Sequence, residues 1–370
     1  MLDRYYSTET RFSLYSRHMD LEMLQFRARI MQKIRTFFIE RGYLELDTPA
    51  LSRDLIPETC LEVFRTDYIE PWSGGTQPLY LVPSPEIYMK KIIARHAVSV
   101  FQLSKCYRNV ESTGRIHSPE FTMLEYYTMN ADYAVSAAVT EDLFTALLPA
   151  PEPAAADGTV RDPYSPLRPP FIRLTMDDAF KAYAGFRLSD CPEAADLADR
   201  AAKLGIAEPA EHPFREWPWD DLYELLLVQC VEPALPREKP VFLTDYPAKV
   251  PCLAKDVTDA VHGSPSEQDS GRTPLWKERW ELYAQGIELA NCYTEETDPD
   301  KVKAYFETEG KLKQNTARVP HAIDPDYWKI FRKFPACSGS ALGVDRLIAL
   351  LAGCSSIDSV LPFPLEQVRH

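Results

Sequence analysis

The sequence predicts an α+β fold in which helices flank a mainly antiparallel sheet. Residues 98–103 and 120–127 have strand character, and the connection between them is polar and contains Gly114, which is typical of an antiparallel hairpin. Residues 21–41 carry apolar side chains at helical spacing. Antiparallel strands with helices packed around them define the α+β class.

The first helix and strand form one compact unit. Ile30, Ile34 and Phe37 lie on one face of the predicted helix 21–41, and Gly42 stands where a glycine commonly ends a helix. Residues 43–47 then alternate as a short strand, which stops before Pro49.

The later elements follow from the same criteria. We expect strands at 79–82, 241–244 and 278–294 and a helix at 86–95. The segment 339–351 is predicted to be a turn of small residues that runs into an apolar helix.

Length and composition fit a single large domain. The chain has 370 residues, of which 45% are hydrophobic and 26% charged, as in ordinary globular proteins. Residues 1–20 form a predicted N-terminal extension without the apolar stretch of a signal peptide. Residues 21–370 form one predicted catalytic domain with insertions near 147–170 and 257–273. There is no long apolar run, so we expect no membrane span and a cytoplasmic enzyme.

Charge and cysteine usage restrict the partners. The net charge is −14, whereas proteins that hold nucleic acid usually present a basic surface. A tRNA substrate is therefore not favoured, and a basic protein partner fits better. The eight cysteines include no C-x-x-C pair, so a zinc site is not expected.

The first candidate site is Arg108 with the strand 120–127. When a carboxylate attacks the α-phosphorus of ATP, negative charge builds up there, and a fixed guanidinium stabilises it. Phe121, Glu125 and Tyr127 share one strand face, so that Phe121 can stack on adenine and the other two can reach a bound amino acid. Taken alone, the pattern also fits a surface arginine beside a half-buried hairpin.

The second candidate site lies in 286–295. A carboxylate, an amide and an aromatic ring share one face there, which suits an ammonium group. These residues are Asn291, Tyr293 and Glu295. Glu288 has the opposite parity, so it needs a twist or a bulge to join them, or it faces a metal on ATP. A strand edge with salt bridges is the alternative, but Ala290 and Cys292 indicate that the opposite face is buried.

Two shorter segments complete the set. In 339–346 the glycines permit close approach of a ligand, and the following helix points its N-terminus and Arg346 at the same place, which suits a triphosphate. The alternative is a helix entry with an Arg–Asp surface pair. Glu86, after Ser84 and Pro85, either binds an α-ammonium or only complements the helix dipole.

Together these segments resemble the three signature motifs of class II aminoacyl-tRNA synthetases. The first is the unit of helix, strand and Pro49, which forms the dimer interface in that family. The second contains Arg108 and residues 117–122, and the third is 339–346. The resemblance implies an antiparallel catalytic sheet, ATP as substrate, Mg²⁺ and a homodimer.

Within class II, residues 84–86, 117–127 and 288–295 resemble the lysyl-tRNA synthetase branch. The resemblance implies that Arg108 and Arg346 are catalytic and hold the phosphates, and that Glu288 faces Mg²⁺ or the nucleotide. The implied ATP-binding residues are Arg108, Asn109, Val110, Glu111, Ser118, Phe121, Glu288, Leu289, Gly343 and Arg346. The implied substrate-binding residues are Ser84, Pro85, Glu86, Glu125, Tyr127, Asn291, Tyr293, Glu295 and Ala341. Among them, Glu295 would pair with a side-chain ammonium, supported by Tyr127.

Two departures narrow the resemblance. The chain offers no room for the N-terminal anticodon-binding barrel of lysyl-tRNA synthetases, and Ala341 replaces the middle glycine of the third motif. Both features are similar to truncated paralogues that modify elongation factor P. The implied reaction is activation of (R)-β-lysine, or lysine, as its acyl-adenylate and ligation to a lysine of elongation factor P. The alternatives are a lysyl activator that charges tRNA or another acceptor, and a catalytically inert paralogue with a regulatory role.

The loop after Arg108 departs from the family. Relatives read Arg-Asn-Glu there, whereas this chain has Val110 between Asn109 and Glu111. Either Glu111 takes the acidic role after a one-residue insertion, or that contact is lost.

Overall fold

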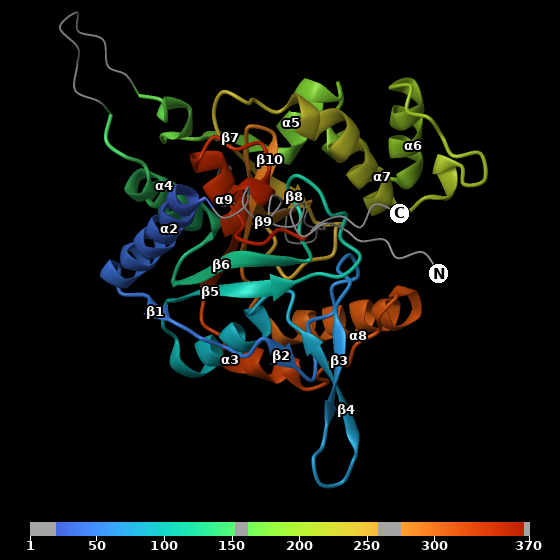
Figure 1. Ribbon diagram of the computed structural model, residues 1–370. Coiled ribbons are helices and arrows are strands. Elements are labelled where there is room, and N and C mark those ends of the chain that lie inside the picture. The colour runs from blue at the N-terminus through green and yellow to red at the C-terminus, as the bar shows by residue number, and fades with distance from the viewer. Residues whose placement is uncertain (1–19, 152–161, 258–274, 366–370) are drawn as a thin grey trace, which may run out of the picture.

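The computed structural model describes residues 20–151, 162–257 and 275–365, and it is built on an eight-stranded sheet (Figure 1). The strand order is β1-β5-β6-β11-β10-β9-β8-β7, and all neighbours are antiparallel except β1–β5 and β7–β8. These strands are β1 (Leu44–Glu45), β5 (Val100–Tyr107), β6 (Glu120–Met129), β7 (Ile172–Thr175), β8 (Val241–Pro247), β9 (Trp276–Ala284), β10 (Ile287–Thr294) and β11 (Cys337–Gly343). The α+β prediction is confirmed.

A second, small sheet consists of β2 (Leu51–Ser52), β3 (Arg65–Ile69) and β4 (Thr76–Leu81). Its β3–β4 hairpin projects from the body of the protein (Figure 1). The helices are α2 (Leu21–Glu40), α3 (Glu86–His96), α4 (Tyr133–Leu147), α5 (Met176–Tyr183), α6 (Ala194–Lys203), α7 (Trp219–Leu226), α8 (Pro299–Thr316) and α9 (Val344–Leu351). None of the described helices is long and apolar enough to span a membrane.

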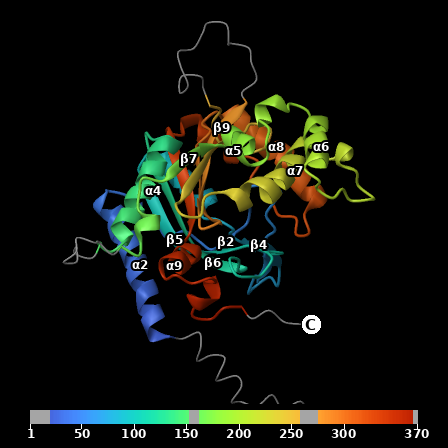
Figure 2. The same cartoon turned by 90° about the horizontal axis from the view of Figure 1, so that it is seen from above.

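One face of the large sheet is closed by α2, α4 and α9, which lie on the same side of it in Figure 2. Their apolar faces meet the inward side chains of the strands in one continuous core. Phe38 of α2, for example, stacks on Phe101 of β5 at 5.0 Å between ring centroids and touches Tyr126 of β6. Among the described residues, this face is therefore packed against helices.

The opposite face is covered only at its two ends. Helices α5, α6 and α7 pack over β7, β8 and β9, whereas α3, with the segment Tyr327–Lys333 that lies against α8, packs over β5 and the far end of β6. The strip between these two groups is formed by β6, β11 and β10. It is the floor of the candidate site.

The strand register places polar residues in rows across this strip. One row runs from Glu125 through Ala341 and Asn291 to Glu281, and the next runs from Tyr127 through Gly339 and Tyr293 to Arg279. Residues that are directly opposite in paired strands lie on the same face. Chain segments far apart in sequence are thus brought side by side by backbone pairing alone.

Several sequence predictions are confirmed. The first helix begins after Asp20, whose side chain accepts from the Glu22 amide, and it ends at Glu40. Gly42 follows with φ +79°, as expected of a glycine just beyond a helix. The predicted strands at 79–82, 98–103, 120–127 and 241–244 and the helix at 86–95 correspond to β4, β5, β6, β8 and α3.

Other predictions are wrong. Residues 339–343 are not a turn but the end of β11, which is paired on both sides, because its small side chains fit a crowded sheet centre. The strand character expected over 278–294 is present, but it belongs to two strands, β9 and β10. They are joined at Gln285 and Gly286, which both have positive φ, as the tightest hairpins require. Helices α4 and α8 were not predicted.

The predicted domain boundaries stay predictions. Residues 1–19 of the extension and 258–273 of the second insertion lie outside the described residues. Of the insertion at 147–170, the described part contains the end of α4 and a short turn at Ser165–Leu167.

A buried ion pair joins the first helix to the last one. The Arg27 guanidinium of α2 lies 2.6 Å from the Asp345 carboxylate at the start of α9, and both side chains are almost fully buried. Asp345 also accepts from the Thr122 amide of β6 at 2.7 Å, and Arg27 donates to the Thr122 hydroxyl at 2.9 Å. The alternative of an Arg–Asp surface pair is therefore wrong: Asp345 is a buried link among α2, β6 and α9.

Gly339 occupies the most crowded point of the strip. A methyl group there would lie 2.3 Å from Glu295 Oε1 and 2.5 Å from Tyr127 Cε1, far inside van der Waals contact. The absence of a side chain on β11 is therefore what lets Tyr127 and Glu295 lie over the strand.

We predict that Gly339→Ala destabilises the protein by about 1–3 kcal/mol, because the added methyl overpacks a rigid sheet. Urea unfolding followed by circular dichroism measures the change. Gly343→Ala is the matched control on the same strand, since its methyl would meet nothing closer than 3.6 Å. Equal stabilities of the two variants would contradict this account of Gly339.

Candidate active site

Two cavities meet on the open strip of the sheet. One, of 150 Å³, is lined by Phe121, Gly343 and Arg346 among others, and the second, of 690 Å³, extends towards α7 and α8. They share Arg108, Glu288 and Asn291. These three residues therefore stand at the junction between a small and a large compartment.

The small cavity collects most of the predicted ATP-binding residues. They are Arg108, Glu111, Ser118, Phe121, Glu288, Leu289, Gly343 and Arg346, and the predicted substrate-binding residues Asn291 and Ala341 line it as well. The Arg108 guanidinium lies 5.2 Å from the Phe121 ring centroid, and its buried Nε has no hydrogen-bond partner among the described residues. An arginine held by an aromatic ring, with donor capacity left over, is suited to a carboxylate or phosphate ligand.

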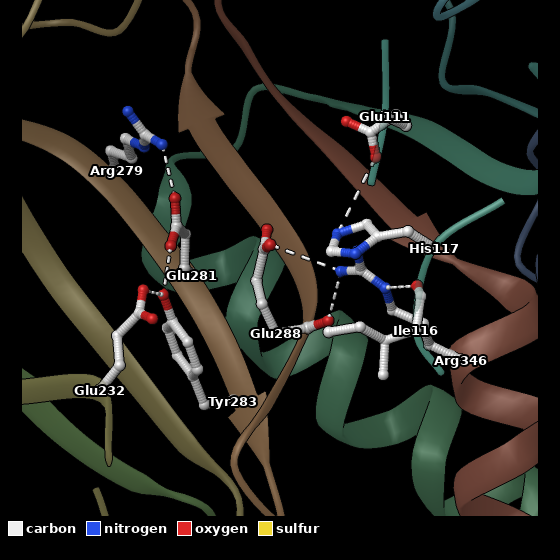
Figure 3. Close-up of polar contacts among 9 residues, drawn as sticks. All are labelled: Glu111, Ile116, His117, Glu232, Arg279, Glu281, Tyr283, Glu288 and Arg346. Atoms are coloured by element: carbon white, nitrogen blue, oxygen red, sulfur yellow. Dashed lines mark hydrogen bonds and ion pairs between the residues drawn. The ribbon is translucent and has the colours of Figure 1, made fainter. Parts of the chain in front are cut away.

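Arg346 is held in place by three contacts from two residues (Figure 3). Its Nε donates to the Ile116 carbonyl at 3.0 Å and its Nη1 to the Glu288 carbonyl at 2.7 Å. The Glu288 carboxylate lies 3.4 Å from the same Nη1. Burial and the Arg346 guanidinium lower the pKa of the neighbouring His117. The third motif thus presents a cation fixed by backbone oxygens from two other segments.

Glu288 joins the site through a bulge. The register between β9 and β10 shifts between Glu288 and Ala290, so the parity of the strand changes at Leu289. Ala290 and Cys292 face the buried core, as predicted, whereas Glu288 and Asn291 both line the cavities. Burial and the nearby Glu281 raise the pKa of Glu288.

The extra residue after Arg108 changes the backbone only within its own loop. Val110 adopts φ +57°, a strained value for a β-branched residue, and it is exposed. Asn109 donates to the Val63 carbonyl and accepts from the Val110 amide, so it ties the loop down. Neither residue lines a cavity, but Glu111 does. The insertion therefore displaces Val110 outwards and leaves an acidic side chain at the site.

The amino-acid side is built around a buried network of carboxylates. Ser84 donates to Glu125 at 2.5 Å. Its hydroxyl also accepts from the Glu86 amide at 3.0 Å, so Ser84, which precedes Pro85, satisfies a free amide at the start of α3. Tyr127 donates to the other oxygen of Glu125 at 2.8 Å. Tyr127 was expected to support Glu295, but the structure assigns its hydroxyl to Glu125.

A lysine that was not among the predicted site residues completes this network. Lys90, one turn after Glu86 on α3, is fully buried, and its ammonium bonds to Glu86 and lies 2.7 Å from Glu295. Glu295 was expected to pair with an ammonium of the substrate, and here it already has one of the protein's own. The spacing of four residues from Glu86 was a signal that sequence reasoning could have used.

The network carries an excess of negative charge. With all groups ionised, the three carboxylates of Glu86, Glu125 and Glu295 exceed the charge of Lys90 by two. Burial raises the pKa of Glu125 to about 8, with Glu86 adding to the effect. Burial also raises the pKa of Glu295 to about 7, although Lys90 opposes it. Such a pocket favours a ligand that brings two ammonium groups.

A second network missed by sequence reasoning borders the large cavity (Figure 3). Arg279 lies 2.5 Å from Glu281, and the Tyr283 hydroxyl bridges Glu281 and Glu232 at 2.8 and 2.9 Å. Glu281 pairs with Asn291 across the hairpin and could have been found by counting back from Gly286. Glu232 follows α7 in the helical unit, and no local pattern indicated it.

The carboxylates of Glu281 and Glu288 fit a magnesium ion. Both line the large cavity, and Glu288 also lines the small one. Mg²⁺ is usually bound by one or two carboxylates together with substrate phosphates. The described residues contain no cluster of three or more metal-ligating side chains, so the protein itself does not form a closed metal cage there.

The remaining predicted residues are placed as follows. Glu86 and Tyr293 line the large cavity, whereas Ser84, Pro85, Glu125, Tyr127 and Glu295 line neither cavity. Glu125, Tyr127 and Glu295 are buried. Some of the predicted residues on the strip thus line the cavities, whereas Glu125, Tyr127 and Glu295 are buried beside them.

Comparisons with known proteins agree with this geometry. The sequence-family model "tRNA synthetases class II (D, K and N)" matches residues 3–367. A protein of Vibrio vulnificus named elongation factor P–(R)-β-lysine ligase is 34% identical over 348 residues, which are 93% of this chain and 96% of the relative. A protein of the same name from Yersinia enterocolitica is 34% identical over 342 residues, which are 92% of this chain and 94% of the relative.

A third relative of that name, from Pectobacterium atrosepticum, is 33% identical over 342 residues, again 92% of this chain and 94% of the relative. The similarity thus extends over both halves of the site. The chain belongs to the class II tRNA synthetases of the D, K and N type and, within them, to the family of the elongation factor P–(R)-β-lysine ligases.

Proposed function

We propose that this protein activates (R)-β-lysine with ATP and ligates the acyl group to a lysine of elongation factor P. The observation that carries the proposal is the position of Arg108, between a small cavity lined by Phe121 and Arg346 and a large one bordered by excess carboxylates. The names of the relatives supply the acyl group and the acceptor.

The first step joins the amino acid to AMP. The carboxylate of (R)-β-lysine attacks the α-phosphorus of ATP, and pyrophosphate leaves. Arg108 touches both compartments, so its guanidinium would bridge the attacking carboxylate and the α-phosphate and stabilise the charge that develops. Arg346, fixed by the Ile116 and Glu288 carbonyls, would hold the leaving phosphates.

ATP would bring Mg²⁺ to Glu288 and Glu281. When bound, the ion would neutralise part of the triphosphate charge. Phe121 would stack on adenine, with Arg108 adjoining the same ring.

Ala341 would help to discriminate β-lysine from α-lysine. It lies between Glu125 and Asn291 in one row of the sheet and lines the small cavity, so its methyl would form part of the floor beneath the amino acid. The two amino acids differ in the carbon that bears one ammonium, and a floor that is one methyl higher changes where that ammonium can lie. A difference of this size is worth about 10–200-fold in specificity.

The protein would act in the cytoplasm as a homodimer. Leu21, Ile39 and Leu44, at the ends of α2 and on the adjoining strand, are exposed apolar residues, and they would be covered by the second subunit. Figure 1 shows α2 on the outside of the protein.

We expect (R)-β-lysine to support exchange of labelled pyrophosphate into ATP better than L-α-lysine, by about tenfold or more. The assay compares both amino acids with a panel of others. The Ala341→Gly variant should show a smaller preference for (R)-β-lysine over L-α-lysine. Preference for α-lysine would retain activation but reopen the question of the acceptor, including tRNA. No exchange with any amino acid would favour an inert paralogue.

Arg108→Ala should lower the same exchange by about 10²–10³-fold, because it removes a preorganised charge at the reacting phosphorus. Arg115→Ala is the control, since Arg115 is an exposed arginine of the same loop that lines neither cavity. Normal exchange by the Arg108 variant would count against the proposed site.

Binding of the amino acid should strengthen as the pH rises through 7 and 8. In the free protein the pKa of Glu295 is about 7 and that of Glu125 about 8, and bound ammonium groups favour the ionised forms. The complex then holds fewer protons than the free protein, so affinity falls by up to about tenfold per pH unit below each free pKa.

Calorimetry in buffers of different ionisation enthalpy would detect the released protons. Glu125→Gln should remove the part of the pH dependence near 8. An affinity that stays constant from acidic to neutral pH would contradict this account.

A further inference from the structure

Glu58 lies in the loop between β2 and β3 and lines the large cavity together with Glu86 and Arg108. The function proposed above assigns no role to it. Its place in the cavity is nevertheless well defined, since both neighbouring compartments open beside Arg108.

The loop that carries Glu58 is anchored on both sides. On one side, Thr59 donates to Glu309 of α8 at 3.0 Å, and Lys313 of α8 donates to the Leu61 carbonyl. On the other, the Asn109 amide donates to the Glu62 carbonyl at 2.8 Å, directly after Arg108. Glu58 is thus held at a fixed position relative to Arg108.

The Glu58 carboxylate has no hydrogen bond and no ion pair among the described residues, and it is only half-buried. Several other carboxylates of the cavity are engaged: Glu86 by Lys90, Glu281 by Arg279, Glu309 by Thr59, Glu232 by Tyr283 and Glu288 by Arg346. Asp220, Asp221 and Glu224 lie on α7, where Asp221 and Glu224 are exposed and Asp220 is half-buried. Glu58 is therefore a free carboxylate beside the junction of the two cavities.

The second step of the proposed reaction requires a proton acceptor. The ε-amine of the acceptor lysine has an ordinary pKa of about 10.4, so it arrives as an ammonium and cannot attack until it loses a proton. Arg108 and Arg346 cannot accept one. Glu86 and Glu295 are paired with Lys90, and in the proposed function they also bind the ammonium groups of the amino acid. They are therefore not free to accept a proton.

We propose that Glu58 is the general base of the transfer step, which takes a proton from the ε-ammonium of the acceptor lysine. This inference rests on the proposed function and adds a catalytic residue to it. The neutral amine then forms a bond to the carbonyl carbon of the β-lysyl-adenylate, and the bond from that carbon to the phosphate oxygen breaks. AMP leaves with the electron pair and takes the second proton of the amine, so the products are the amide, AMP and protonated Glu58.

The surroundings of Glu58 suit this role. Burial and Glu86 raise its pKa to about 7, although Arg108, Lys90 and Lys313 oppose them. The other titratable groups that face it are Cys60, Tyr293 and Tyr305. A base with a pKa close to the working pH is ionised in part and still accepts a proton readily.

The test separates the two half-reactions of Glu58→Gln. Exchange of pyrophosphate with (R)-β-lysine should match the wild type, because the variant leaves Arg108 and the carboxylates around Lys90 in place. Single-turnover transfer from preformed adenylate to elongation factor P should fall by about 10²-fold or more. Hydroxylamine, a nucleophile that is already neutral at pH 7, should react with the adenylate equally fast on both enzymes.

Two further variants sharpen the test. Glu224→Gln removes the same charge from the exposed wall of the cavity and should transfer normally. Glu58→Asp keeps a carboxylate and should restore part of the rate. The wild-type transfer rate should level off above pH 7, where Glu58 is ionised, whereas that of Glu58→Gln should keep rising with pH.

Several results would overturn the proposal. Normal transfer by Glu58→Gln excludes a base at this position. A parallel loss of exchange or of hydroxylamine reactivity assigns Glu58 a structural role, and an equal loss in Glu224→Gln assigns the effect to docking of the acceptor. If the wild type itself shows no exchange with β-lysine, the proposed function fails and this inference fails with it.

Discussion

The site depends on β11, which lies between β6 and β10 and contributes almost no side-chain volume where it crosses the strip. Gly339 lets Tyr127 and Glu295 lie over the strand, and Ala341 lies in the neighbouring row between Glu125 and Asn291. A larger residue at either position would separate the carboxylates from the open face. The small side chains of β11 are therefore the steric condition that allows the charged residues around them to form the pocket.

A second constraint fixes the position of Arg346. Asp345, adjacent to Arg346, is bound by Arg27 of α2 and by the Thr122 amide of β6. A buried pair of this kind is costly to break from one side, since the remaining charge loses its partner. Through Arg27, helix α2 thus fixes the start of α9 and, with it, the direction of the Arg346 side chain.

Strand parity predicted much of the site from the sequence. It placed Asn291 and Tyr293 on one face, and it required a twist or a bulge to bring Glu288 to that face; the register shows a bulge. It did not single out Lys90 as a site residue, because a lysine on an amphipathic helix normally reaches solvent, and only the carboxylates of Glu86 and Glu295 beside its ammonium make its burial favourable. Nor could it identify β11 as a strand, since small residues have low strand propensity and the pairing on both sides overrides it.

The buried carboxylates have opposite consequences for stability and for binding. Burial raises the pKa of Glu125 to about 8, so the folded protein holds that proton more tightly than the unfolded chain, in which a glutamate titrates near 4.3. The stability gained from this proton is complete at acidic pH and is lost as the pH rises towards 8. At neutral pH Glu125 therefore mostly keeps its proton in the empty pocket, because burial and the neighbouring Glu86 disfavour its ionised form, whereas ammonium groups of a ligand would favour that form. The buried carboxyl groups thus stay largely protonated in the free protein and would ionise when a diamino acid binds, which would favour it over amino acids with a single ammonium group.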